Sequence, residues 1–494
     1  MKALYPSLYQ INTRLWLAEI SRVIGRPARL DDIPDAELDL LGDKGFDWIY
    51  LLSLWRVSEA SCRVAKENQE LRKECLAVLP DLRDKDIGGS GFAIGGYEVN
   101  PAVGDTASLA RLRDRLHKRG LKLMLDFVPN HVGLDHPWVK EHPEYFITGT
   151  ESDLANAPQN YVRIKNSKGK IILAHGRDPN FPGWSDTLQL DYSNPATPEA
   201  MKEELRKIAA LSDGVRCDMA MLLLPEVFER TWNRKIQPFW PQVIGQIREQ
   251  FPEFCFLAEV YWNLEWTLQK QEFDYTYDKR LYDRLRGKNS RTVREHFRAG
   301  LDFQNKLVRF LENHDEERAA AAFDGKIHQA AAVITYLSPG MRFFHQGQLE
   351  GRKIRIPNQL VRAPKEAPDH GLRDFYDKLL ALLSQWAIRE GRWRLLECVP
   401  AWEGNWTSDS FLSFAWEGSP GERFLLGVNY SGHQSQCYVR LPYPDLSGKK
   451  LLLKDRMGTV QFDRIGKDLY SQGLYLDLAP WAYHVFEIKR TDGK

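Results

Sequence analysis

Four short polar stretches, each placed where an apolar, strand-like run stops, constrain the fold of this 494-residue chain more than any other feature. Helical patterns separate the apolar runs, and alternating strands and helices favour a parallel sheet. Because the carboxyl ends of parallel strands meet at one edge, we expect the polar residues to converge there. The stretches are residues 126–131 (DFVPNH), 214–218 (GVRCD), 257–260 (LAEV) and 312–315 (ENHD).

The spacing of the apolar runs predicts an α/β fold of the (β/α)8 TIM-barrel class. One strand–helix unit is plain, because Leu109, Leu112 and Leu116 recur at helical spacing and Gly120 ends the helix before the next run. About eight such units favour a closed barrel over an open doubly wound sheet. The predicted strands are residues 8–16, 48–55, 121–127, 214–218, 254–260, 273–277, 307–311 and 341–345.

Changes in sequence texture predict three parts. Residues 133–192 follow the third strand and are rich in Pro, Asn, Gly and Asp, so we expect a small inserted domain B. From residue 391 helical periodicity disappears and short alternating strands follow, which predicts an antiparallel β-sandwich. The predicted parts are a barrel (1–132 and 193–390), the insertion (133–192) and the C-terminal domain (391–494).

Charge and composition exclude several classes of protein. With 68 basic and 67 acidic residues, the chain has no field that would attract nucleic acid or an anionic membrane. No stretch approaches the ~18 apolar residues of a membrane span. Residues 1–6 hold no signal core, and the six cysteines form no C-x-x-C pair, so we expect a cytoplasmic protein. Its oligomeric state is not indicated.

Carboxylates at the ends of four predicted strands point to glycosidic bond cleavage. Any one of Asp126, Asp218, Glu259 and Asp315 could be a helix cap, but four on one rim are hard to explain as caps. Retaining cleavage needs two carboxyl groups about 5–5.5 Å apart, one nucleophilic and one protonated. Asp218 suits the nucleophile, because Arg216 lies two positions away on the same strand face and would keep it ionised.

The remaining polar residues suit supporting roles. Glu259 has no cationic neighbour in its own strand, so a raised pKa would let it act as the general acid. Asp315 would stabilise the oxocarbenium-like charge, while His131 and His314 would bind ring hydroxyls. Each histidine, like Arg216, could instead be an ordinary polar contact. Neither has a second His at i+2 or i+4, so we predict no metal site there.

The four stretches resemble, in order and spacing, the signature regions of the α-amylase family of retaining α-glycosidases and transglycosidases. The resemblance covers essentially the whole chain and implies a catalytic barrel, a domain B and a C-terminal β-sandwich. It implies that Asp218 is the nucleophile, Glu259 the general acid/base and Asp315 the transition-state stabiliser. The resemblance further implies sugar-binding roles for four residues, Asp126, His131, Arg216 and His314.

Two departures from the family pattern affect the details. Phe92 stands where the family has a sugar-stacking Tyr, so the ring platform remains but a hydroxyl is lost. Gln189 stands where the resemblance implies a calcium-binding Asp, although Asn130 matches another ligand. Calcium takes six or more oxygen ligands, so a structural calcium is possible but not favoured, and no cofactor is expected to be required.

The leading hypothesis is hydrolysis of α-1,4-glucosidic bonds in starch-type glucans or maltooligosaccharides through a covalent glycosyl–Asp218 intermediate. A transglycosidase or an amylosucrase-like, sucrose-using glucosyltransferase stays open as an alternative, and so does a catalytically silent glycan-binding scaffold. The expected partner is therefore an α-glucan or oligosaccharide. Five tryptophans are candidate stacking platforms that spacing alone does not place: Trp55, Trp138, Trp184, Trp262 and Trp266.

Overall fold

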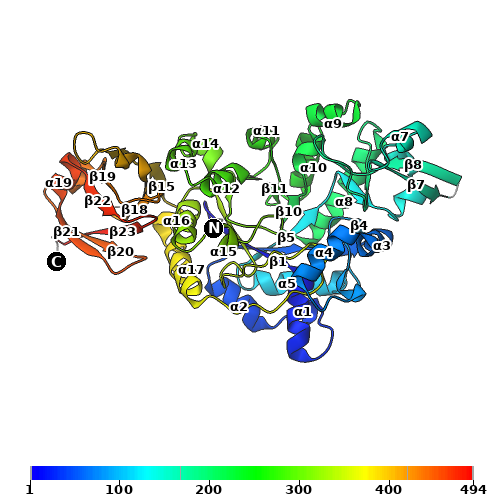
Figure 1. Cartoon of the computed structure of the whole chain (residues 1–494), viewed down its shortest axis with the longest axis horizontal. Coiled ribbons are helices and arrows are strands. Elements are labelled where there is room, and N and C mark those ends of the chain that lie inside the picture. The colour runs from blue at the N-terminus through cyan, green and yellow to red at the C-terminus, as the bar shows by residue number, and fades with distance from the viewer. Residues whose placement is uncertain (1–2, 167–168, 420, 492–494) are drawn as a thin grey trace.

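The computed structural model describes residues 3–166, 169–419 and 421–491. Met1 and Lys2, the first of the residues in which no signal core was expected, lie outside these ranges. Eight parallel strands close into a barrel, in the order β1-β14-β13-β12-β11-β10-β5-β2 (Figure 1). The predicted (β/α)8 class is confirmed. The strands are β1 (Ser7–Asn12), β2 (Trp48–Leu52), β5 (Lys122–Phe127), β10 (Gly214–Cys217), β11 (Cys255–Ala258), β12 (Tyr275–Tyr277), β13 (Leu307–Arg309) and β14 (Met341–His345).

The first predicted strand was too long, because residues 8–16 are divided between a strand and a helix. β1 ends at Asn12, whose side-chain oxygen accepts a hydrogen bond from the backbone N–H of Leu15. That bond satisfies a donor in the first turn of α1 (Thr13–Ile24), so the helix begins directly after the strand. The apolar residues that follow Asn12 therefore pack from a helix face and not from a strand.

Helices follow most barrel strands and form the outer layer (Figure 1). None of the helices in the described ranges is long and apolar enough to cross a membrane. The longer helices of this layer are α1, α2 (Asp35–Asp43), α5 (Thr106–His117), α8 (Ala196–Leu211), α9 (Pro225–Trp232), α10 (Trp240–Gln250), α12 (Lys279–Arg286), α13 (Ser290–His296), α16 (Lys326–Tyr336) and α17 (His370–Leu383); shorter turns are α11 (Glu265–Lys270), α14 (Leu301–Gln304), α15 (Ala319–Ala322) and α18 (Trp386–Arg389).

Two insertions extend the carboxyl-terminal side of the barrel. The first holds β3 (Trp55–Val57), α3 (Glu59–Glu67), α4 (Gln69–Val78) and β4 (Ile94–Val99). The second holds β6 (His131–Gly133), α6 (Trp138–Glu141), α7 (Glu151–Asn156), β7 (Tyr161–Asn166), β8 (Gly169–Ala174) and β9 (Thr187–Gln189). β6 pairs with β9, so the second insertion leaves and re-enters the barrel at one place. The exact domain limits drawn from the sequence stay predictions.

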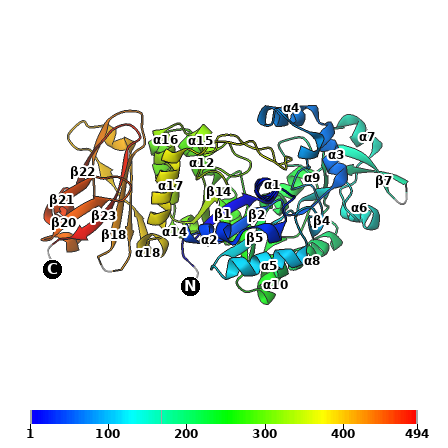
Figure 2. The ribbon, with the colours of Figure 1, turned by 90° about the horizontal axis from the view of Figure 1, so that it is seen from below.

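The C-terminal part is an antiparallel β-sandwich, as the sequence predicted. Six strands form one sheet in the order β15-β17-β18-β23-β20-β21, and β16, β19 and β22 form another. Figure 2 shows α16 and α17 between these sheets and the barrel. The strands and the helix are β15 (Arg392–Leu395), β16 (Cys398–Val399), β17 (Phe411–Glu417), β18 (Arg423–Asn429), β19 (Ser435–Val439), β20 (Lys450–Asp455), β21 (Gln461–Ile465), α19 (Gly466–Ser471), β22 (Leu474–Leu478) and β23 (Tyr483–Arg490).

Candidate active site

Strand register brings the predicted site residues together at the carboxyl-terminal mouth of the barrel. β10 lies between β5 and β11, and Arg216 of β10 pairs directly with Asp126 of β5. Asp218 and Glu259 each come one residue after their strands end, so both project from neighbouring strands into the same mouth. Asp315 reaches it from the loop after β13. All four carboxylates expected to converge therefore do so.

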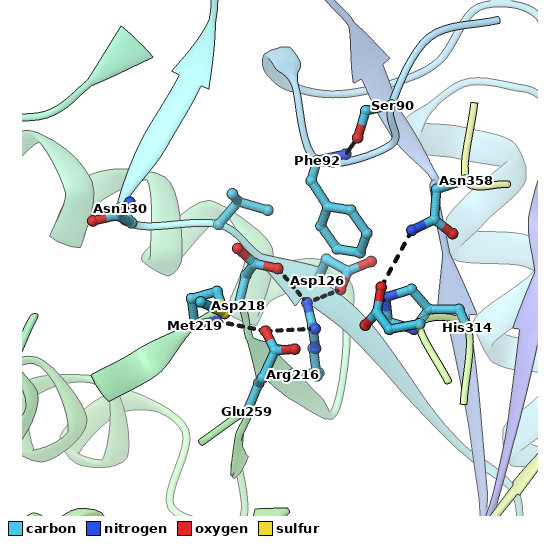
Figure 3. A network of polar contacts seen from close by, with 12 residues as sticks. Ser90, Phe92, Asp126, Asn130, Arg216, Asp218, Met219, Glu259, His314 and Asn358 are labelled. Carbon is cyan, nitrogen blue, oxygen red and sulfur yellow. Dashed lines mark hydrogen bonds and ion pairs between the residues drawn. The ribbon is translucent and has the colours of Figure 1, made fainter. Parts of the chain in front are cut away.

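One buried guanidinium connects three of these carboxylates (Figure 3). Arg216 is 1% exposed, and its Nη1 lies 2.6 Å from Oδ1 of Asp218 and 3.4 Å from Oδ1 of Asp126. Its Nη2 lies 2.7 Å from Oε2 of Glu259. The pairing of Arg216 with Asp218 was predicted, but the contact with Glu259 was not, because it crosses from one strand to the next.

Glu259 is held by two further donors that the sequence analysis missed. The backbone N–H of Met219 donates to Oε2 at 2.7 Å, and the Tyr261 hydroxyl donates to Oε1 at 2.8 Å. Met219 adopts φ 43°, a left-handed conformation that costs a non-glycine residue of order 1–3 kcal/mol. The conformation turns its N–H toward Glu259. Tyr261 could have been found, since it lies two residues after Glu259, as Arg216 lies two before Asp218.

Two aromatic side chains hold Asp126 in position through hydrogen bonds. The Tyr50 hydroxyl donates to its Oδ1, and the Trp55 indole N–H donates to its backbone oxygen at 2.8 Å. Trp55 is fully buried, so among the five unplaced tryptophans it supports the site from the core and does not face a ligand. Asp126 itself is 2% exposed and does not line the cavity. Its contacts are those of a residue that orients Arg216.

His314 and Asp315 form the opposite side of the site. His314 Nε2 lies 3.0 Å from Oδ2 of Asp315, and the Nδ1 atom is 2.9 Å from Nε2 of Gln10. Asn358, from the long loop after β14, donates to Oδ1 of Asp315 at 3.5 Å. The Asp315 side chain is 40% exposed, so it is the most accessible of the expected catalytic carboxylates. No role in the site was predicted for Gln10 or Asn358.

Phe92 packs against this cluster, on a turn whose path requires a glycine at the preceding position, Gly91. Its ring stacks on His314 with centroids 5.2 Å apart, and the Arg216 guanidinium lies 5.1 Å from the same ring. A Cβ on Gly91 would lie 2.1 Å from the Ser53 hydroxyl and 3.1 Å from its Cα, so a larger residue would push the turn outward. The predicted ring platform is therefore placed by the close approach of the backbone at Gly91.

These side chains surround a cavity of about 320 Å³. His131 and Trp184 form part of its wall, with ring centroids 5.1 Å apart, and His131 is 4% exposed. Burial lowers the pKa of His131 to about 3, so the imidazole is neutral near pH 7 and suits hydrogen bonding to hydroxyls. The cavity lies within the usual size of small-molecule sites.

Burial and charge act in opposite directions on the two central carboxyl groups. Burial raises the pKa of Asp218 and of Glu259 above the ordinary values, and the Arg216 guanidinium opposes both rises. Neighbouring carboxylates add to both rises, because Asp126 and Asp315 raise the pKa of Asp218, while Asp218 and Asp315 raise the pKa of Glu259. The arrangement favours one proton shared within the pair, which is the state that an acid and a nucleophile require.

The residues at the implied calcium position make a different structure. Nε2 of Gln189 donates to the backbone oxygen of Asn130 at 3.0 Å, to its Oδ1 at 3.0 Å and to the Leu190 oxygen at 3.1 Å. An N–H group thus occupies the oxygens that a cation would need, so these residues do not fit calcium. Across the described ranges, no three His, Cys, Asp or Glu side chains form a group that could hold a metal ion.

A closed parallel barrel with carboxylates gathered around one arginine at its carboxyl mouth is typical of enzymes that act on glycosidic bonds. The family described as "Alpha amylase, catalytic domain" matches residues 84–369, more than half of the chain. The chain therefore belongs to the α-amylase family, and the resemblance found in the sequence is confirmed. Members of this family include both hydrolases and transferases, as the similar proteins illustrate.

Two curated relatives represent these activities. Alpha-amylase 3 of Dictyoglomus thermophilum is 23% identical over 299 residues, which cover 54% of this chain and 55% of that protein. An alpha-1,4-glucan:maltose-1-phosphate maltosyltransferase of Cereibacter sphaeroides is 27% identical over 247 residues, covering 48% of this chain and 30% of that protein. The matches thus span about half or less of the length of these relatives.

Solved structures agree on the fold across the whole chain. The maltogenic alpha-amylase AmyB of Thermotoga neapolitana superposes with a TM-score of 0.69 at 16% identity, covering 98% of both chains. An alpha-amylase of Lactobacillus plantarum gives a TM-score of 0.66 at 19% identity, covering 98% of this chain and 99% of that one. At such identities the likeness concerns the fold alone.

Proposed function

We propose that this chain is a retaining α-glycosidase that hydrolyses α-1,4-glucosidic bonds in starch-type glucans or maltooligosaccharides. The observation that carries the proposal is the contact of one guanidinium with both Asp218 and Glu259 on the wall of a single cavity. Two carboxyl groups held this closely on one face suit retention, because inversion needs wider separation to admit a water molecule.

In the first step, an Asp218 oxygen attacks the anomeric carbon while the glycosidic bond breaks. Glu259 gives its proton to the departing oxygen, so the leaving sugar departs as a neutral alcohol and Glu259 becomes a carboxylate. Arg216 keeps Asp218 ionised before attack and steadies Glu259 after the transfer. The product of this step is a glycosyl ester of Asp218.

In the second step, an incoming hydroxyl group attacks the same carbon and expels the Asp218 carboxylate. Glu259 takes the proton of the attacking group and returns to its starting state. Asp315, His131 and His314 line the cavity and would bind ring hydroxyls and developing positive charge. When the attacking group is water the reaction is hydrolysis, and when it is a sugar hydroxyl the reaction is transglycosylation.

Transglycosylation is the second candidate function. The maltosyltransferase relatives and the "Trehalose synthase/amylase TreS" of Mycobacterium tuberculosis, 27% identical over 207 residues that cover 39% of this chain and 34% of that protein, favour it as strongly as the amylases favour hydrolysis. An amylosucrase-like use of sucrose belongs to the same alternative. A silent scaffold is disfavoured, since a binding protein has no need to bury Asp218, Glu259 and Arg216 together.

The absence of a calcium requirement and a cytoplasmic location belong to the same proposal. Gln189 supplies a hydrogen-bonded link where a cation would otherwise join the insertion to the barrel. The six cysteines are present as thiols and not as disulfides, which supports a reducing compartment.

Product analysis tests the proposal. Starch, maltotriose, pullulan, a cyclodextrin and sucrose are incubated with the enzyme side by side, and the products are separated by chromatography. We expect shorter α-1,4-linked products from starch and maltotriose, with the α-anomer first in proton NMR. Longer products only, or activity on sucrose only, would favour the transferase. An initial β-anomer would contradict retention.

A further inference from the structure

Free space is unequal on the two sides of the carboxylates. Ser90, Asn358 and Gln359 line one part of the cavity that holds them. A cavity of about 390 Å³ at Arg14, Gly88 and Val361 shares no lining residue with it, and the cavity that does share His314 and Asn358 with it measures only about 30 Å³. That volume holds one or two water molecules. On the other side, past Met219 and Tyr261, a second cavity of about 430 Å³ opens. Of these neighbouring cavities, only the one past Met219 and Tyr261 both borders the carboxylate cavity and has room for a sugar ring.

Two chain segments form the closed side. Residues 84–92 end in the turn that carries Phe92, and residues 354–363 belong to the long loop after β14. An antiparallel bridge joins Ile87 to Leu360, with backbone hydrogen bonds from Gly88 N–H to the Gln359 oxygen at 2.8 Å and from Val361 N–H to the Asp86 oxygen at 2.9 Å. Backbone hydrogen bonds of the antiparallel type thus join the two segments that close this side of the cavity.

Arg14, at the start of α1, donates hydrogen bonds to the backbone of both segments. Its Nη1 donates to the Gly89 oxygen at 2.9 Å, and its Nη2 donates to the Asn358 oxygen. Arg14 is 6% exposed, and burial lowers its pKa to about 10, so it stays charged near neutral pH. One cationic fork therefore holds a backbone oxygen from each segment, next to the residues that line the cavity.

Packing makes this closure part of the folded structure. Ile87 and Leu360 share a small apolar core with the α3 and α4 helices; its other buried members are Ala65, Cys75 and Leu79. A Cβ on Gly88 would lie 2.4 Å from Cγ1 of Val361, so the segments approach as closely as glycine allows. On the outer side, Arg362 pairs with Asp86 at 2.8 Å.

The direction of the bound chain follows from Glu259. Met219 and Tyr261 both donate to Glu259, and both also line the second cavity. A general acid must face the departing sugar, so the reducing-end side of the substrate lies toward the second cavity. Trp262, which is 36% exposed, offers a ring there. The side of Ser90 and Asn358, which Figure 3 shows across the site from Met219, must then receive the non-reducing end.

We propose that the site is a blind pocket for the non-reducing end of an α-glucan, closed by the pairing of residues 84–92 with 354–363 and fastened by Arg14. The enzyme is then exo-acting, and the remainder of the chain leaves through the second cavity. The inference rests on the proposed glycosidase function and adds the end of the substrate that is recognised.

A pair of substrates tests the inference in the wild-type enzyme. p-Nitrophenyl maltoheptaoside is compared with the same compound carrying a 4,6-O-benzylidene group on its non-reducing glucose. We expect the blocked compound to react roughly 100-fold more slowly, because the added group would have to displace packed backbone. Equal rates would overturn the inference while leaving the glycosidase function standing. Inactivity on both compounds would overturn the proposed function as well.

Loosening the closure gives a second test. In Arg14→Ala, which keeps every residue of the carboxylate cluster, we expect the rate on the blocked compound relative to the free one to rise roughly tenfold. Arg362→Ala, which changes a partly exposed side chain on the same pairing, should raise the ratio less and keeps the test available if Arg14→Ala does not fold. The matched control is Arg26→Ala, whose partner Asp32 lies outside both segments. An unchanged ratio in a folded Arg14→Ala or Arg362→Ala protein would contradict the closure.

Discussion

Arg216 reaches from its own strand to Glu259, with 2.7 Å between Nη2 and Oε2, as closely as it contacts Asp218 at 2.6 Å. A single fixed cation thus acts on the expected nucleophile and on the expected acid. The charge of Arg216 keeps Asp218 available as an anion and limits how far burial raises the pKa of Glu259. The balance between the two carboxyl groups depends on this one side chain.

Replacing Arg216 by Lys should separate charge from geometry. A lysine keeps the positive charge, but a single ammonium group lacks the planar fork that contacts both carboxylates. We expect kcat/KM to fall roughly 100- to 1000-fold, in the range found when one donor to developing charge is removed. Steady-state kinetics measure the loss, and near-UV circular dichroism of the variant should match the wild type. A loss below tenfold would show that charge alone suffices.

Removing the Tyr261 hydroxyl should shift the pH profile. The hydroxyl donates to Glu259, and a hydrogen bond to the ionised form lowers a carboxyl pKa. In Tyr261→Phe the pKa of Glu259 should therefore rise, so the protonated acid persists to higher pH. We expect the alkaline limb of kcat/KM to move upward by roughly one pH unit. Tyr470→Phe, in α19 of the C-terminal domain, is the control, and a downward shift would refute the assignment of Glu259.

Gly91 and Ser53 should show compensating substitutions. Gly91→Ala places a methyl group against the Ser53 side chain, so it should displace Phe92 and lower kcat/KM. Ser53 has φ 61°, which suits glycine, and Ser53→Gly removes the Oγ and Cβ atoms that the methyl group meets. We expect the double variant to regain most of the activity lost in Gly91→Ala. If the double variant is as impaired as Gly91→Ala, the turn is not limited by this contact.

Chelation should leave the protein unchanged, whereas removing the Gln189 amide should not. EDTA is expected to alter neither Tm nor activity, because an N–H group takes the place of a cation beside Asn130. Gln189→Ala would leave three buried oxygens without their donor and should cost about 1–3 kcal/mol. Thermal unfolding with and without EDTA measures both effects, and Gln159→Ala in the same insertion is the control. A fall in Tm on chelation of the wild type would contradict this account.

Much of the fold and several site contacts follow from local sequence spacing. The alternation of apolar runs predicts the barrel because parallel strands are buried on both faces. The pairing of Arg216 with Asp218 follows from their separation of two residues, which puts them on one strand face. The early end of β1 was missed because Asn12 starts a helix while the apolar run continues beyond it.

Contacts between segments distant in sequence could not be predicted in this way. Arg216 meets Glu259 because of the register between β10 and β11, which no local pattern specifies. Met219 donates to Glu259 only through a left-handed backbone, and Asn358 arrives from a loop whose path depends on packing against α3 and α4. Local spacing predicts which side chains share a face, while register and loop packing decide which of them touch.

Trapping the covalent intermediate tests the central claim most directly. A 5-fluoro-α-glucosyl fluoride slows the second step, so the enzyme should gain the mass of one fluoroglucosyl group. Peptide mapping should then place the group on Asp218, and Asp218→Asn should gain no mass. A label on Glu259 or Asp315, or turnover that yields the β-anomer without any adduct, would contradict the account.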